Sequence, residues 1–152
     1  MSGGELVFRL LAAFRDLVDA MHAELARRGH PDVRPAHGFA LQAIAPGPVT
    51  GSELAGRLGV TKQAAGKTAD LLVGHGYVER TGDPGDARRR LLALTPRGRE
   101  VLGISAEVLE RRRSAWEARV GPEGFAALAD GLRALPLDAA GPLAAASWFV
   151  PS

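Results

Sequence analysis

Apolar residues recur at intervals of three and four from Glu5 to Arg28. The positions are Leu6, Val7, Leu10, Leu11, Phe14, Leu17, Val18, Met21 and Leu25. This spacing lines one side of a helix, so it predicts a long amphipathic helix over 5–29 that Gly29 and Pro31 end. The apolar stripe is wide for a helix with one small neighbour. It therefore indicates a contact with a second subunit, with burial inside the monomer as the alternative.

A second helix is predicted over 36–45, and the Pro-Gly-Pro sequence that follows it ends it. Thr50 and Glu53 then have the spacing of a capping box, in which the two side chains accept hydrogen bonds from amides at a helix start. That helix closes at Gly59, a residue suited to the left-handed turn at a helix end. Because Thr61 can cap another helix almost at once, this stretch predicts a helix-turn-helix.

The helix after Thr61 has two faces of different chemistry. One face carries Ala65, Thr68, Ala69 and Leu72, and the other carries Lys62, Gln63, Gly66, Lys67 and Asp70. A helix in the DNA major groove needs long hydrogen-bond donors near its N-terminus and little bulk where its backbone approaches the duplex. Gly66 costs roughly 1 kcal/mol of helix stability relative to alanine, and close approach would explain it. The polar face thus indicates nucleic-acid binding, although Leu71 does not fit it.

A basic hairpin is predicted directly after this helix. Residues 77–79 have the pattern of a short strand, residues 82–86 are dense in turn-forming types, and 88–94 return as a second strand. Three consecutive arginines, Arg88, Arg89 and Arg90, lie beside the tip. A helix-turn-helix followed by such a hairpin is a winged helix, whose hairpin lies along the DNA backbone or enters the minor groove.

The last third of the chain predicts two more helices and an apolar tail. Thr95 and Pro96 can start a helix that runs to about Val120. After a Gly-Pro break, a final helix is expected to face inward with Phe125, Leu128, Leu132 and Leu135. Beyond Pro136 the chain is poor in charge, and its end is too apolar for an ordinary tail. We expect this tail, 136–152, to dock on its own subunit or on a partner.

Composition narrows the class of protein. The 152 residues suffice for one hydrophobic core and predict one domain. The chain has no cysteine, which excludes disulfides, thiolate metal sites and thiol redox sensing. The formal charge is only +2, but arginines gather in and after the hairpin while the first helix is balanced or acidic. The sequence offers no run of about 18 apolar residues and no signal-peptide pattern, so we expect a soluble, cytoplasmic protein without a membrane partner.

An enzyme is the rival class, and the motifs that would support it are missing. The sequence has no Gly-x-Ser-x-Gly elbow, no phosphate-binding loop and no His-Glu-x-x-His pair. Its four histidines are scattered, so no metal site and no cofactor are predicted.

These motifs resemble those of the multiple-antibiotic-resistance regulator (MarR) family of dimeric winged-helix repressors. The resemblance covers roughly residues 5–135. It rests on Ser-Glu-Leu-Ala at 52–55, Thr-Lys-Gln-Ala at 61–64, Gly-Tyr-Val-Glu-Arg at 76–80, and the wing Asp-Pro-Gly-Asp-Ala-Arg at 83–88 that leads to Leu-Thr-Pro-Arg-Gly at 94–98. It implies a mainly α fold with a small β-hairpin: a winged helix-turn-helix lobe at 36–95, between dimerisation helices at 5–29 and 96–135.

The resemblance also implies roles for particular residues. The carboxylate of Asp86 would orient the guanidinium of Arg88, which would enter the minor groove. A pocket between the dimerisation helices and the DNA-binding lobes would take a small aromatic or amphipathic effector. Its candidate residues are Phe14, Met21, His22, His37, Phe39 and Trp116.

Together, the sequence predicts a sequence-specific regulator that binds a pseudo-palindromic double-stranded operator as a homodimer and represses transcription. The DNA contacts would come from the helix after Thr61, called the reading helix here, and from the wing. The residues are Thr61, Lys62, Gln63, Gly66, Lys67, Asp86, Arg88, Arg89 and Arg90. Two alternatives stay open at this point. One is a winged helix used for protein contacts without DNA, and the other is a DNA-binding activator.

Overall fold

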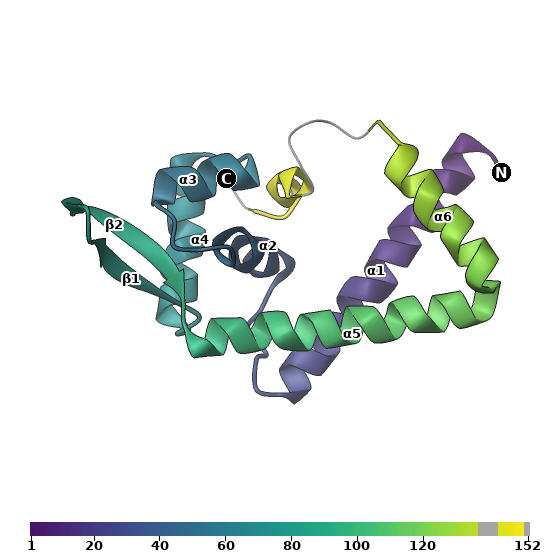
Figure 1. Cartoon of the computed structure of the whole chain (residues 1–152), viewed down its shortest axis with the longest axis horizontal. Helices are drawn as coiled ribbons and strands as arrows, with labels where there is room; N and C mark the ends of the chain where they lie inside the picture. Colours follow the sequence, from purple (N-terminus) through teal and green to yellow (C-terminus); the bar gives the residue numbers. More distant parts are fainter. Residues whose placement is uncertain (137–142, 151–152) are drawn as a thin grey trace. The chain divides into compact units, whose positions relative to one another are not determined.

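The computed structural model describes residues 1–136 and 143–150, and within them it has six α-helices, one hairpin and a short 3-10 helix (Figure 1). The elements are α1 (Gly3–Arg27), α2 (Pro35–Ile44), α3 (Gly51–Leu58), α4 (Lys62–Gly74), β1 (Val78–Asp83), β2 (Asp86–Leu94), α5 (Pro96–Val120), α6 (Pro122–Ala134) and η1 (Ala144–Trp148). None of the helices in this part of the chain is both long and apolar enough to span a membrane.

The chain divides into two compact units. The helical unit comprises residues 1–31 and 104–138, and the hairpin unit comprises residues 32–103 and 139–152. The boundary between them lies inside α5, after Gly103, whereas the sequence placed the end of the lobe at Thr95. The first two turns of α5 therefore belong with the hairpin.

The helix starts in the hairpin unit confirm the capping signals. The Thr50 hydroxyl accepts a hydrogen bond from the Glu53 amide at 3.1 Å, and the Glu53 carboxylate accepts one from the Thr50 amide at 2.7 Å. Gly59 ends α3 with φ of +64°, which a residue with a side chain would rarely adopt. The Thr61 hydroxyl then accepts from the Ala64 amide at 3.1 Å and starts α4. These local interactions fix the angle at which α4 leaves α3.

The core of the hairpin unit lies between its helices and the base of the hairpin. Leu54 and Leu58 of α3, Leu72 of α4 and Tyr77 are all fully buried there. Val49, in the turn before α3, forms an isolated antiparallel β-bridge with Leu92 of β2. This bridge attaches the turn to the side of the hairpin. Burial of each such leucine side chain stabilises the fold by about 1.5–3 kcal/mol. The hairpin is thus anchored at its base, and its far end projects.

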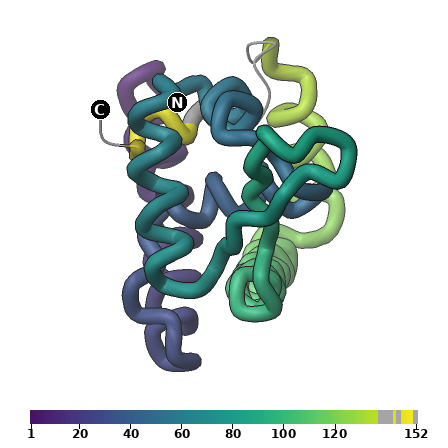
Figure 2. Tube along the Cα trace, turned by 90° about the vertical axis from the view of Figure 1, so that its left-hand side faces the viewer, coloured from purple at the N-terminus to yellow at the C-terminus, as the bar shows by residue number. Residues whose placement is uncertain are grey.

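The hairpin itself is longer than the sequence pattern indicated. β1 continues to Asp83 and β2 begins at Asp86, so only Pro84 and Gly85 form the loop (Figures 1 and 2). The prediction of a strand that stops at residue 79 and a five-residue turn was wrong. Turn-forming residues occupy the ends of both strands because an irregularity in register between Gly82 and Asp83 accommodates them there.

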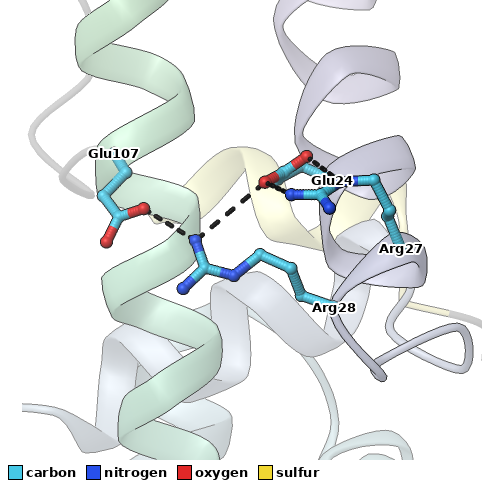
Figure 3. Close-up of polar contacts among 4 residues, drawn as sticks. All are labelled: Glu24, Arg27, Arg28 and Glu107. Carbon is cyan, nitrogen blue, oxygen red and sulfur yellow. Dashed lines mark hydrogen bonds and ion pairs between the residues drawn. The ribbon is translucent and has the colours of Figure 1, made fainter.

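In the helical unit, charged contacts join the region of α1 to α5. Leu25 of α1 and Val108 of α5 are buried. Arg28, the residue after α1, forms a 2.7 Å ion pair with Glu107 of α5 and lies 4.0 Å from Glu24 (Figure 3). Arg27 also pairs with Glu24, at 2.7 Å, and this hydrogen bond is the main cause that lowers the pKa of Glu24. This cluster fastens the end of α1 to the middle of α5.

Much of the apolar surface of the helical unit is exposed. The most exposed side chains on α1 are Phe8, Val7 and Leu11, at 73%, 61% and 60%. The sequence predicted that the last helix faces inward, and this prediction was wrong, because Leu128, Leu132 and Leu135 are all more than 40% exposed. Within the described residues, Leu128 and Leu132 of α6 are thus left partly uncovered.

Candidate nucleic-acid interface

The outer face of α4 is polar and basic, as the sequence predicted. Lys62, Gln63 and Lys67 are exposed, whereas the opposite face is buried in the hairpin unit. A Cβ added at Gly66 would meet nothing within 4 Å, so packing inside the chain does not require a glycine there. A glycine at position 66 would be required if another molecule approached the backbone of α4 there.

One carboxylate on this face is neutralised by the hairpin. Asp70 of α4 forms a 2.5 Å ion pair with Arg80 of β1, and both side chains are partly exposed. The pair connects the reading helix to the first strand of the wing and removes a negative charge that would repel phosphate. Sequence reasoning missed Arg80, because a pairing between a helix and a following strand has no fixed spacing that could indicate it.

Two aspartates shape the tip of the wing through backbone amides. The Asp83 carboxylate accepts from the Gly85 amide at 2.8 Å, and the Asp86 carboxylate accepts from the Arg88 amide at 2.9 Å. These are side-chain mimics of a backbone turn. The expected contact between Asp86 and the guanidinium of Arg88 is not among the contacts of the described residues. Asp86 thus holds the main chain at Arg88, and its predicted effect on the guanidinium of Arg88 stays a prediction.

The three arginines of the wing differ in their surroundings. Arg89 lies 3.4 Å from Asp83 and 3.5 Å from Glu53, so it ties β2 to the start of α3. The guanidinium groups of Arg88 and Arg90 form no ion pair within the described residues, and both are exposed. The sequence treated all three as equivalent DNA contacts. The structure leaves two available for phosphate and gives the third acidic partners of its own.

Glu53 links the capping box of α3 to the wing. Its pKa lies below the ordinary value of 4.5, chiefly because its carboxylate accepts the hydrogen bond from the Thr50 amide, with smaller contributions from Arg89 and Arg57. The ionised form is thus the form that caps the helix and attracts Arg89.

The base of the wing explains the Leu-Thr-Pro-Arg-Gly sequence at 94–98. The Thr95 hydroxyl donates to the Gly76 carbonyl at 2.6 Å and accepts from the Gly98 amide at 3.1 Å. A Cβ at Gly98 would lie 2.1 Å from the carbonyl oxygen of Tyr77, so only glycine fits. The guanidinium of Arg97 lies over the Tyr77 ring at 4.9 Å. These contacts of Thr95, Arg97 and Gly98 with residues 76–77 form a joint between β1 and α5. The joint fixes the position of the hairpin base on the core.

The predicted ligand-binding residues fall in both units. Phe14, Met21, His22 and Trp116 belong to the helical unit, and His37 and Phe39 belong to the hairpin unit. His37 has a local structural role, because its Nδ1 accepts a hydrogen bond from the Arg34 amide at 3.1 Å and caps α2. The effector site thus stays a prediction.

A different hollow lies on the helical unit. It is a groove of about 490 Å³ along α1 and α5, lined by small apolar side chains together with Glu24, Arg27, Arg111 and Arg112. None of the predicted ligand residues lines it.

A helix-turn-helix with an exposed basic reading helix, followed by a basic hairpin, is a winged helix. Residues 32–89 match the model of the MarR family. No curated protein matches the chain. The match lies within the hairpin unit, and the fold of the chain is similar to solved structures that include MarR itself.

Solved structures with this fold cover most of the chain. RV1404 from Mycobacterium tuberculosis is 28% identical with a TM-score of 0.73, over 88% of this chain and 92% of that one. The transcriptional regulator Tm0710 from Thermotoga maritima is also 28% identical, with a TM-score of 0.62, over 85% and 88%. FabT from Streptococcus pneumoniae, solved in complex with DNA, has 22% identity and a TM-score of 0.72, over 87% and 93%.

Proposed function

We propose that this protein is a transcriptional regulator that binds a pseudo-palindromic operator in double-stranded DNA and represses the genes beside it. The proposal rests on one observation: α4 and the wing belong to the same compact unit, and both carry exposed hydrogen-bond donors. These donors are Lys62, Gln63 and Lys67 on α4 and Arg88 and Arg90 on the wing. A reading helix suits the major groove and a basic wing suits the flanking minor groove. The complex of FabT with DNA, which shares the fold, supports the same use of this unit.

The active form is a homodimer built from the helical units. The exposed apolar residues of α1 and α6 support this, since such a large apolar surface is unfavourable in water and a second copy would cover it. A two-fold symmetric dimer places two reading helices on two half-sites about one helical turn apart, which is why the operator is expected to be pseudo-palindromic. An effector bound near the six predicted ligand residues would relieve repression by changing how well the dimer fits both half-sites.

The test is selection of bound fragments from sheared genomic DNA by the purified protein, followed by footprinting of the enriched sites. The proposal expects protected regions with two similar half-sites about 10 base pairs apart, occupied by one dimer in sedimentation analysis. The double variant Lys62→Ala with Gln63→Ala is expected to lose this selectivity while it keeps the dimer. If no fragment is enriched even at low salt, the proposed function is wrong.

A further inference from the structure

The C-terminal residues 143–150, called the strap here, lie against the helices of the hairpin unit. Val150 is only 7% exposed and packs with Ala36 of α2 and Ala64 of α4. The ring of Phe149 stacks on that of Phe39 at 5.6 Å between centroids. Most of the strap is the short 3-10 helix η1, and Ala146 in the middle of this helix is fully buried. The strap thus fills an apolar seat formed by Ala36, Phe39, Val60 and Ala64.

The seat lies directly behind the DNA-facing end of the reading helix. Val60 precedes the capping residue Thr61, and the Ala64 amide is the group that donates to the Thr61 hydroxyl. Lys62 and Gln63, which neighbour these residues in the chain, are exposed on the other side. The strap therefore supports the start of α4 from within and leaves the polar face of the helix uncovered.

The way in which the strap is held allows it to leave. The seat is made of small and apolar side chains, and apolar contacts can be broken and remade without leaving a buried charge unpaired. Trp148, the largest side chain of the strap, is 88% exposed and adds little to its hold. The chain between α6 and the strap is rich in proline, glycine and alanine, and it carries a single charged residue, Asp138. Docking thus involves Val150, Phe149 and the buried Ala146, whereas Trp148 stays in solvent.

We propose that the strap is a removable part of the DNA-binding core: when docked, it holds the N-terminal end of α4 in place, and when undocked, it lowers the affinity of the protein for duplex DNA. The proposal rests on the proposed function for its effect on DNA, but docking itself has a consequence that needs no DNA. Loss of the strap exposes Val60 and Ala64 and loosens the first turn of α4, so the amides there exchange with solvent more readily.

The experiment compares full-length variants by hydrogen exchange without DNA and by DNA binding. Val150→Asp places a carboxylate against the apolar seat, and Phe149→Ala removes the stacking on Phe39 and is the milder change. Trp148→Ala is the matched control, since it removes a larger aromatic side chain from the same segment without touching the seat. Circular dichroism establishes that each variant keeps its helices.

The proposal expects faster exchange of the amides of residues 60–66 in Val150→Asp and Phe149→Ala, with exchange in Trp148→Ala as in the parent. The affinity of Val150→Asp for duplex DNA should fall roughly 5- to 50-fold, within the usual range for coupled sites. Unchanged exchange in both seat variants would overturn the strap model. Faster exchange with equal or higher affinity would overturn its effect on DNA. If the parent binds no DNA, the proposed function fails, while the exchange result still decides whether the strap supports α4.

Discussion

The carboxylate of Asp86 accepts a hydrogen bond from the backbone amide of Arg88 at 2.9 Å, and this contact fixes the main chain at the tip of the wing. The guanidinium of Arg88 is left exposed, without an ion pair in the described part of the chain. A rigid backbone that carries an unpaired cation suits phosphate or minor-groove contact, because little order has to be gained in the backbone on binding. The wing therefore resembles a preformed anion-binding element.

Replacement of Arg88 by alanine should weaken operator binding by about 1–3 kcal/mol per site. The Asp86 hydrogen bond uses the backbone amide of residue 88, so the hairpin should keep its shape in the variant. Fluorescence anisotropy with a labelled operator measures the change. The control is Arg119→Ala, which removes an exposed arginine from the last turn of α5, outside the hairpin unit. Equal losses in the two variants would mean that general charge, rather than the wing, determines affinity.

Replacement of Asp70 by asparagine should strengthen non-specific DNA binding. The change removes a negative charge from the face of α4 and releases Arg80 from its ion pair, so another cation can neutralise phosphate. The log–log dependence of affinity on salt should become steeper by about 0.9 for each additional phosphate that is neutralised. Asp130→Asn, which breaks a similar exposed pair with Arg133 on α6, should leave the slope unchanged. Weaker binding in Asp70→Asn would show that the pair chiefly positions the wing.

Replacement of Glu53 by glutamine should reduce the sensitivity of the fold to acid. The pKa of Glu53 is lowered from 4.5 in the folded chain, so its ionised form stabilises the fold above that pH, and this contribution is lost as the pH falls through the lower folded value. The free energy of unfolding of the variant should therefore fall less steeply than that of the parent as the pH is lowered through and below 4.5. Urea unfolding at several pH values measures it. A parallel fall in both proteins would contradict the capping role of the carboxylate.

Arg89→Ala provides a companion measurement at the same carboxyl. The pKa of Glu53 should rise only part of the way towards its ordinary value, because the larger cause, the Thr50 amide, remains. A carboxyl-carbon NMR titration reports this directly. A complete return to the ordinary value would mean that the wing arginine, and not the capping box, holds the ionised form.

Two glycines of α5 should respond oppositely to alanine. Gly98→Ala would place a Cβ 2.1 Å from the Tyr77 carbonyl, so the base of the wing must shift, at a cost of about 1–3 kcal/mol or more. Gly103→Ala meets nothing within 4 Å in the middle of the same helix and should stabilise the fold by about 0.5–1 kcal/mol. Thermal unfolding of the two variants tests both. A stable Gly98→Ala variant with unchanged DNA binding would contradict the role assigned to this joint.

The sequence predicted those parts of the site that depend on neighbours in the chain. The caps at Thr50 and Thr61, the left-handed Gly59 and the two faces of α4 all follow from spacing within one turn of helix, and the structure confirms them. The pairing of Asp70 with Arg80 and the contacts of Arg89 could not be predicted, because they join separate elements. The faces of α6 were misassigned because an apolar stripe indicates burial without indicating which chain provides the cover.

The hairpin unit is proposed to bind DNA through cations that neutralise phosphate, and the decisive measurement is a salt series. The affinity of the purified protein for an operator fragment should fall steeply as salt rises. If three to four cations per subunit of a dimer contact phosphate, the slope of log affinity against log salt should be about −5 to −7, and Arg88→Ala should reduce its magnitude. A slope near zero, or one that is the same in Arg88→Ala, would contradict this account of the reading helix and wing.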